Sequence, residues 1–296
     1  MSFESLYAET VRNGHPDLAP GPAMEPQYLM RMAVPSWAAH MAQWDSWGQA
    51  VRADFDIKRD IAYGETAAEK LDIVMPLQPA ANMPVVVLIH GGYWRALDKD
   101  GILFAARPLA RNGILTVNVD YALCPNVSLT ELTAQCHRAM RWVRGNIAAY
   151  GGDPGNIHCA GHSAGAHLSA MLALSPEFSC NIHTICAVSG LYDLAPVACA
   201  SMQAELRLTE DEIAALSPLR LPPPHNGHWI FAVGTEETPA FIWQTYRYAA
   251  HCAAGGAIAQ VIPLPGANHY SAISKLDEDG GELPEAWLRH IKETNA

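Results

Sequence analysis

The sequence predicts an α/β fold, in which a mainly parallel central sheet is covered by helices on both faces. Continuous apolar runs such as PVVVLI, at 84–89, are typical of strands that are buried on both faces of a sheet. Segments with apolar residues at helical spacing alternate with these runs, which favours right-handed βαβ crossovers. The chain has 296 residues, of which 50% are apolar, so it can bury a large core of this kind.

The regular pattern begins near Asp60 and can be followed element by element. Apolar runs predict strands at 59–64, 70–76, 84–90, 113–123, 156–162, 183–193, 228–237 and 257–269. Helical spacing between these runs predicts helices at 103–112, 129–151, 164–175, 239–256 and 285–293. Gly151 and Gly255 supply helix stop signals. The Pro-rich stretch at 217–227 is expected to be a connection within the domain rather than a linker between domains.

Residues 1–55 differ in composition from the rest, and we predict that they form an arm or lid on a main domain that spans 56–296. The second half of this segment is rich in Trp and Met, and it favours one or two amphipathic helices that lie on the main domain. Trp37, Trp44 and Trp47 suit ordinary packing, and the alternative is that they form a lid over an apolar site. The same aromatic segment suits a homodimer contact.

Charge and cysteine content argue against several classes of protein. The formal net charge is −11 and no run of Lys and Arg is present, which argues against nucleic-acid or anionic-membrane partners. The 7 cysteines include no Cys-x-x-Cys pair, so they predict free thiols in a reducing compartment. The N-terminus lacks a signal-peptide pattern, and no apolar stretch approaches the roughly 18 residues of a membrane helix. We therefore expect a cytoplasmic protein.

The segment GHSAG, at 161–165, carries the strongest chemical signal. It matches G-x-S-x-G, with a predicted strand before it and a predicted helix after it, which is the context of a nucleophile elbow. Such a turn holds the serine, here Ser163, in a strained conformation with an exposed hydroxyl. The following helix N-terminus favours developing negative charge. The alternative, a glycine-rich turn with an incidental serine, fits this context less well.

A serine hydroxyl is a weak nucleophile and requires a general base. Proteins with this elbow place the acid and then the histidine after the serine along the chain. His269, in PGANHY just beyond the last predicted strand, is therefore the expected base for Ser163. The competing histidines are less well placed, because His251 lies within a predicted helix while His225 and His228 precede their strand.

The triad acid is expected in the loop GTEETP, at 234–239, which follows the preceding strand. Glu236 and Glu237 compete for the role, and we favour Glu237, leaving the other as a solvated loop residue or a charge at a helix N-terminus. No aspartate lies in this loop. Asp193, after an earlier strand, is an alternative.

HGGYW, at 90–94, follows a buried strand and suits an oxyanion hole. Acyl transfer creates an oxyanion that needs preorganised N–H donors, and glycines allow the backbone N–H groups to face the substrate. The expected donors are Gly91, Gly92 and Ala164, the last being the residue after the nucleophile. His90 is expected to shape the loop rather than to transfer protons.

Three neighbouring side chains are candidates for binding substrate: Tyr93, Trp94 and His162. The flat rings of the tyrosine and tryptophan suit an aromatic or hydrophobic substrate, while the alternative for both is core packing. His162 and His167 lack the H-E-x-x-H pattern of zinc proteases, and no phosphate-binding loop of the G-x-x-x-x-G-K type is present. We expect no metal and no other cofactor.

With these residues identified, the sequence resembles the α/β-hydrolase superfamily, and within its hormone-sensitive-lipase-like branch most closely the kynurenine formamidases, or arylformamidases. HGGYW resembles the formamidase variant of the HGGG oxyanion loop, and YGGDPGNIHCAGHSAGAHL is similar to the nucleophile region. The segments LDIVMP and SGLYDLAP resemble the family too, so that the resemblance covers about 70–269. GTEETPAF resembles the acid loop G-x-x-D-S-P-E-F, which aligns Glu237 with the family's catalytic aspartate.

The resemblance implies a serine hydrolase that cleaves an aryl formamide such as N-formyl-kynurenine to formate and an aromatic amine through an acyl-enzyme. A carboxylesterase, or another amidase of aromatic or heterocycle catabolism, is the alternative, because specificity depends on pocket contacts. A non-catalytic ligand-binding protein on the same scaffold is a more distant alternative, since such a protein need not keep a triad. Residues 56–296 would then be the catalytic domain.

Overall fold

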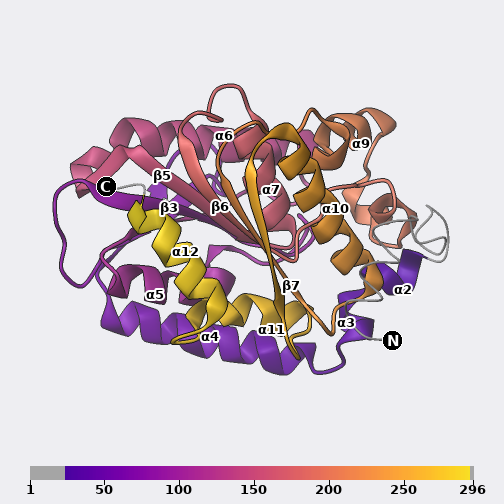
Figure 1. Ribbon diagram of the computed structural model, residues 1–296, viewed down its shortest axis with the longest axis horizontal. Helices are drawn as coiled ribbons and strands as arrows, with labels where there is room; N and C mark the ends of the chain where they lie inside the picture. The colour runs from indigo at the N-terminus through magenta and orange to yellow at the C-terminus, as the bar shows by residue number, and fades with distance from the viewer. Residues whose placement is uncertain (1–23, 294–296) are drawn as a thin grey trace.

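The computed structural model describes residues 24–293, in which eight strands form one mainly parallel sheet (Figure 1). The strands are β1 (Ile57–Ala62), β2 (Lys70–Val74), β3 (Met83–Ile89), β4 (Leu115–Val119), β5 (Gly152–His162), β6 (Ile182–Val188), β7 (His228–Gly234) and β8 (Ile258–Leu264). Their order is β1-β2-β4-β3-β5-β6-β7-β8. The pairs β1–β2 and β2–β4 are antiparallel and the other pairs are parallel, so the predicted sheet is confirmed.

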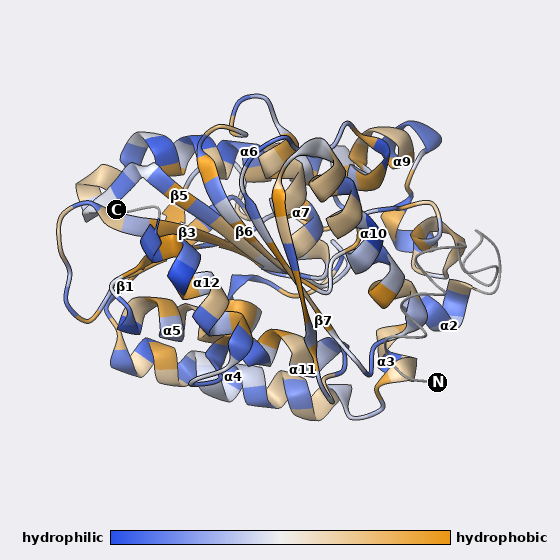
Figure 2. Cartoon of the chain, viewed as in Figure 1, coloured by the Kyte–Doolittle hydropathy of each residue, from blue (hydrophilic) through white to orange (hydrophobic). Residues whose placement is uncertain are grey.

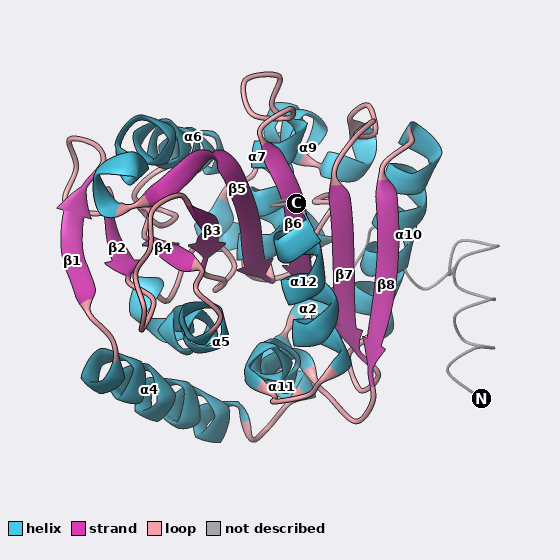
Figure 3. Cartoon of the chain, turned by 60° about the vertical axis from the view of Figure 1, so that its left-hand side comes forward, coloured by secondary structure: helices cyan, strands magenta, loops and turns pink. Residues whose placement is uncertain are grey.

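Helices cover both faces of this sheet, as predicted (Figure 3). The α-helices are α2 (Glu25–Tyr28), α3 (Met30–Ala33), α4 (Trp37–Asp54), α5 (Ala106–Arg111), α6 (Leu129–Asn146), α7 (Ala164–Leu174), α8 (Gln203–Leu206), α9 (Glu210–Leu216), α10 (Pro239–Gly255), α11 (His269–Ser274) and α12 (Glu282–Glu293). The short 3-10 helices are η3 (Lys99–Ala105), η4 (Ile147–Tyr150), η5 (Val197–Cys199), η6 (Pro218–Arg220) and η7 (Lys275–Asp277). Within the described residues no helix is both long and apolar enough to cross a membrane.

Strand β3 shows how the alternation of side chains along a strand builds a core on each face of the sheet. Val85 and Val87 belong to the core that the sheet shares with α6, α7 and α10. Val86 and Leu88, which point the opposite way, belong to the core beneath α5 and α12. All four side chains are buried, and Figure 2 shows the apolar strands enclosed between helices whose outer faces are polar. This two-sided burial explains why the strand has no polar residues at alternate positions.

Several element boundaries differ from the predictions for local reasons. The predicted helix at 103–112 begins as the 3-10 helix η3, whose first turn is capped by the Asp98 side chain. Helix α10 is closed by Gly256 rather than by Gly255, because Gly256 adopts the left-handed conformation with φ of 102°. Helices α9 and α11 were not predicted, although Thr209 and Asn268 form capping boxes at their starts. The first part of the predicted N-terminal segment, residues 1–23, lies outside the described residues.

Two buried neutral histidines make the folded state sensitive to acid. Burial lowers the pKa of His158 to about 3 and the pKa of His167 to about 4. Unfolded histidine binds a proton near pH 6.5, so the unfolded state binds more protons than the folded state as the pH falls below that value. The stability linked to these groups is therefore complete above about pH 6.5 and is lost progressively down to about pH 4 for His167 and about pH 3 for His158.

We expect urea unfolding to show a loss of about 2 kcal/mol per buried histidine between pH 7 and pH 5. His167→Asn should reduce the slope of stability against pH by close to one proton. His225→Asn changes an exposed side chain and serves as the matched control. Equal slopes for His167→Asn and the wild type would contradict this account of acid sensitivity.

Candidate active site

Ser163 occupies the sharp turn between β5 and α7, where its φ is 56° and its ψ is −118°. A positive φ is strained for a residue with a side chain, and such strain is typical of functional turns. A Cβ on Gly161 would lie 2.3 Å from the carbonyl carbon of Gly165, and a Cβ on Gly165 would lie 2.0 Å from the carbonyl oxygen of Ile89. The two flanking glycines are therefore a steric requirement of a turn that packs α7 this close to the sheet.

His269 lies beside this serine although the two are 106 residues apart in sequence. It is the first residue of α11, directly after Asn268, whose side chain caps that helix. The ring Nε2 lies 3.2 Å from the Ser163 Oγ, and Nδ1 lies 2.7 Å from the Glu237 Oε2. All three side chains are buried. The structure thus brings the predicted serine, histidine and acid into one hydrogen-bonded chain.

The Glu237 carboxylate is held at both oxygens. Oε1 accepts hydrogen bonds from the backbone N–H of Gly234 and from the hydroxyl of Ser189, which leaves Oε2 for His269. Sequence reasoning did not identify the role of Ser189, although it is a polar residue directly after the carboxyl end of β6, where functional groups of parallel sheets gather.

The competing acids and bases lie elsewhere in the structure. Glu236 is exposed, and the Asp193 carboxylate forms an ion pair with Arg220. His251 contacts the carbonyl oxygen of Leu221 through Nε2. His228 lies beside His290, while His225 is exposed. None of these side chains contacts Ser163 within the described part of the chain.

The loop HGGYW follows β3 and passes directly beside the serine. A Cβ on Gly91 would lie 3.3 Å from the Ser163 Cβ, and a Cβ on Gly92 would lie 2.0 Å from the carbonyl oxygen of Ala96. Gly92 also has φ of 107°, which favours glycine. Ala164 begins α7 on the other side of the serine, so its N–H lies in the first turn, where helical N–H groups have no intrahelical acceptor.

His90 shapes this loop, as expected, and does not line the cavity beside Ser163. Its ring stacks on Tyr121 with centroids 4.1 Å apart, and its Nδ1 lies 2.8 Å from the carbonyl oxygen of Gly91. Its Nε2 lies 3.3 Å from a carboxylate oxygen of Asp120. The hydroxyl of Tyr121 donates to the carbonyl of His90, which closes a buried cluster behind the loop.

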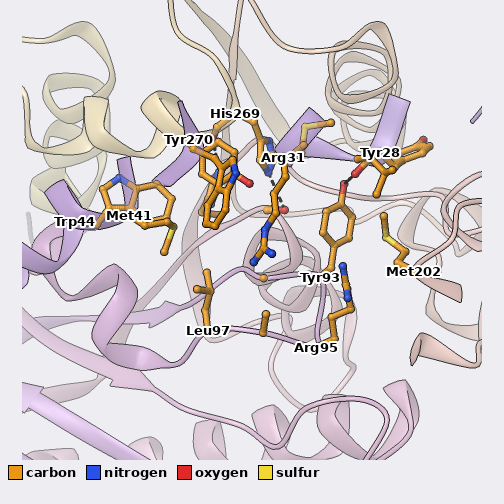
Figure 4. A pocket seen from close by; sticks show the side chains of 17 residues that line it. Tyr28, Arg31, Met41, Trp44, Tyr93, Arg95, Leu97, Met202, His269 and Tyr270 are labelled. Atoms are coloured by element: carbon orange, nitrogen blue, oxygen red, sulfur yellow. Dashed lines mark hydrogen bonds between the residues drawn. The ribbon is translucent and has the colours of Figure 1, made fainter. Parts of the chain in front are cut away.

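A cavity of about 380 Å³ opens at Ser163 and His269 (Figure 4). Its walls are mostly apolar. The N-terminal segment supplies much of the lining, namely Tyr28, Leu29, Met30, Arg31, Trp37, Met41 and Trp44. Residues after β3 supply Gly92, Tyr93, Arg95, Ala96 and Leu97, and more distant parts of the chain supply His162, Met202 and Tyr270. A cavity of this size and composition suits a small aromatic ligand.

Two of the three predicted substrate-binding side chains, Tyr93 and His162, line the cavity. Tyr93 lines the cavity, where its hydroxyl donates to the carbonyl of Tyr28. Trp94 does not line the cavity, and its prediction as a pocket residue was wrong. It is fully buried in the core, where the centroid of its ring lies 5.0 Å from the centroid of the His167 ring. A change of direction at two consecutive positive-φ residues, Tyr93 and Trp94, turns the second ring away from the site.

His162 lines the cavity and has a second contact that the sequence did not reveal. Its Nε2 lies 2.9 Å from the backbone carbonyl oxygen of His269, so the ring N–H donates to that carbonyl. Burial, together with the neighbouring His269, lowers the pKa of His162 well below its usual value, which keeps the ring neutral. The residue before the serine therefore anchors the main chain that carries the histidine.

Comparison with known proteins gives a consistent assignment. The BD-FAE family model matches residues 71–214. A kynurenine formamidase from Salmo salar is 31% identical over 241 residues, an alignment that covers 78% of this chain and 80% of the relative. This chain belongs to the kynurenine formamidase family. A second family member, from Danio rerio, is 29% identical over 262 residues, which cover 86% of this chain and 88% of the relative.

A solved structure supports the fold of this formamidase-family chain. A Silicibacter protein provisionally called a thioesterase superposes with a TM-score of 0.79 at 26% identity, covering 91% of this chain and 98% of that protein. The formamidase family and this neighbour place the chain among hydrolases of the α/β-hydrolase fold. The predicted superfamily and branch are thereby confirmed. Within residues 24–293 no group of three or more His, Cys, Asp or Glu side chains is arranged to hold a metal ion.

Proposed function

We propose that this formamidase-family protein is a serine hydrolase that cleaves an aryl formamide, such as N-formyl-kynurenine, to formate and an aromatic amine. The observation that carries the proposal is the buried hydrogen-bonded chain from Ser163 through His269 to Glu237, which opens into an aromatic cavity. The substrate class is taken from the relatives, which are kynurenine formamidases.

Each residue has a defined task in the proposed reaction. The Ser163 Oγ attacks the formyl carbon while its proton passes to the His269 Nε2. The N–H groups of Gly91, Gly92 and Ala164 stabilise the resulting oxyanion. The C–N bond then breaks, and His269 delivers the proton to the departing amine nitrogen. Glu237 orients the imidazole and stabilises its positive charge throughout.

Water completes the cycle by the same route in reverse. A water molecule gives a proton to the His269 Nε2 as its oxygen adds to the formyl-serine carbon. When the tetrahedral intermediate collapses, the bond to Ser163 breaks and His269 returns the proton to Oγ, which releases formate. No group besides these residues and water is needed to balance the reaction.

The N-terminal part of the chain would act as a fixed roof on residues 56–296 in this proposal. Trp44 is almost fully buried against Phe104 and donates from its indole nitrogen to Ser274, while Trp47 also packs on Phe104. Trp37 and Trp44 also line the cavity. Trp44 thus combines the two roles considered from the sequence, because it packs on Phe104 and also lines the cavity, whereas Trp47 packs without lining the cavity.

A carboxylesterase is the second candidate, because the same triad and oxyanion donors would cleave an aryl ester. The neighbour called a thioesterase favours cleavage of an acyl bond whose leaving group is not an amine. A purely binding role accounts less well for a nucleophile, base and acid that are mutually hydrogen-bonded.

The deciding experiment compares kcat/KM for N-formyl-kynurenine and p-nitrophenyl acetate, each with the wild type and with Ser163→Ala. We expect serine-dependent cleavage of the formamide with a higher kcat/KM than that of the activated ester. Ester cleavage with negligible formamide turnover would reject the substrate and keep the triad. Ligand binding without turnover of any ester or amide would favour the binding role.

A further inference from the structure

The cavity beside Ser163 contains two cationic side chains but no carboxylate among its described lining residues. The cations are Arg31, on α3, and Arg95, in the loop after HGGYW. The two arginines differ in whether a described carboxylate already balances their charge. Arg95 forms a hydrogen-bonded ion pair with Glu205, so its charge is already balanced. Arg31 has no carboxylate partner among residues 24–293.

Arg31 is nevertheless held in a defined position. Its guanidinium carbon lies 4.3 Å from the centroid of the Trp37 ring, which is a cation–π contact. Burial raises the pKa of the Tyr270 hydroxyl, and the nearby charge of Arg31 opposes that rise, so the guanidinium lies close to this hydroxyl. Figure 4 shows the side chain extending from the roof into the space between Tyr270 and Tyr93. The Trp37 ring holds the guanidinium from one side, and no carboxylate within residues 24–293 occupies its N–H donors.

A guanidinium that lies in a mostly apolar cavity and has no carboxylate partner among residues 24–293 suits the binding of a planar anion. Its fork of N–H groups matches the two oxygens of a carboxylate, and this match gives stronger hydrogen bonds than a neutral acceptor would. The protein as a whole is acidic, with a net charge of −11, so a general positive field does not explain anion binding here. Any preference for an anionic substrate must come from local cations.

We propose that Arg31 is a specificity-determining residue that binds a carboxylate on the part of the substrate remote from the scissile bond. The proposal deepens the proposed function and rests on its assignment of the cavity as the substrate site. The preferred substrates are aromatic amides or esters that carry a carboxylate, rather than neutral aryl esters. Arg95 makes a smaller contribution because Glu205 competes for it.

The test compares two ligands of similar shape, the negatively charged 3-acetoxybenzoate and its neutral methyl ester. Calorimetric titrations into Ser163→Ala protein give the ratio of their affinities without consuming either ligand. We expect Arg31→Gln to lower the preference for the charged ligand by about fivefold, because Arg31 is exposed and solvent weakens its charged hydrogen bonds. Arg31→Lys keeps the charge but lacks the planar fork, and it should restore part of the preference.

Arg52→Gln is the matched control, since Arg52 lies on α4, pairs with Asp100 and does not line the cavity. An unchanged ratio in Arg31→Gln, or a larger fall in Arg95→Gln, would overturn the proposal. So would an equal loss of affinity for both ligands, which would indicate a structural role. These titrations require no formamide turnover, so a failure of the proposed reaction and a failure of this proposal are distinguishable.

Discussion

Replacing Ser163 by alanine is expected to lower kcat for the preferred substrate by about 10⁵ to 10⁶-fold, the largest effect of any single change in this protein. The reason is that His269 would have no hydroxyl to deprotonate, while the oxyanion donors would remain in place. The residual rate would come from those donors and from substrate binding. Single-turnover kinetics with N-formyl-kynurenine, or with the best ester if esters are preferred, measure the loss.

Ser175→Ala is the matched control for this change, because Ser175 follows the far end of α7 and lies outside the cavity. Its kcat should stay within about twofold of the wild type. A phosphonate that labels reactive serines should modify the peptide containing Ser163 and no other. Labelling of a different serine, or retention of activity in Ser163→Ala, would show that the nucleophile lies elsewhere.

Glu237→Gln is expected to lower kcat by about 10⁴-fold, the second largest effect. Because Gly234 N–H and the Ser189 hydroxyl both donate to Oε1, the oxygen of the new amide should occupy that position. Its NH₂ group would then face the His269 Nδ1, to which it can only donate. The ring would carry its proton on Nε2 and could no longer accept the proton of Ser163.

The control for this prediction is the neighbouring residue. Glu236→Gln makes the same chemical change on an exposed side chain and should leave kcat within about twofold. Steady-state rates of the two variants, measured beside their thermal midpoints, separate catalysis from folding. Equal losses in both variants would contradict the assignment of Glu237, and a loss confined to Glu236→Gln would reverse it.

The positions of the strands along the chain and the loops that carry the triad could be predicted from sequence because each depends on local rules. A serine flanked by glycines between an apolar run and a helix pattern predicts the turn at 161–165 wherever the rest of the chain lies. His269 and the acidic loop follow from their positions after successive strands. The two glutamates could not be ranked by such rules alone, since only their burial and partners distinguish them.

Other features depend on contacts between distant segments. Trp94 sits one residue beyond Tyr93, and only the backbone turn decides which ring enters the cavity. The hydrogen bond from His162 to the carbonyl of His269 joins positions 107 residues apart. Likewise, the carboxylate partner of Arg95 is on α8, whereas Arg31 has no carboxylate partner among residues 24–293, and no periodicity in the sequence encodes that difference.

The origin of the cavity roof has an evolutionary consequence. The groups at the reacting bond come from loops dispersed over the chain, whereas a single stretch, 28–44, forms much of the surface facing the rest of the ligand. Exchange or mutation of that stretch would alter ligand choice while the inherited chemistry stays intact. Members of one lineage could therefore acquire new substrates through a short, contiguous piece of coding sequence, without re-optimising the machinery that breaks the bond.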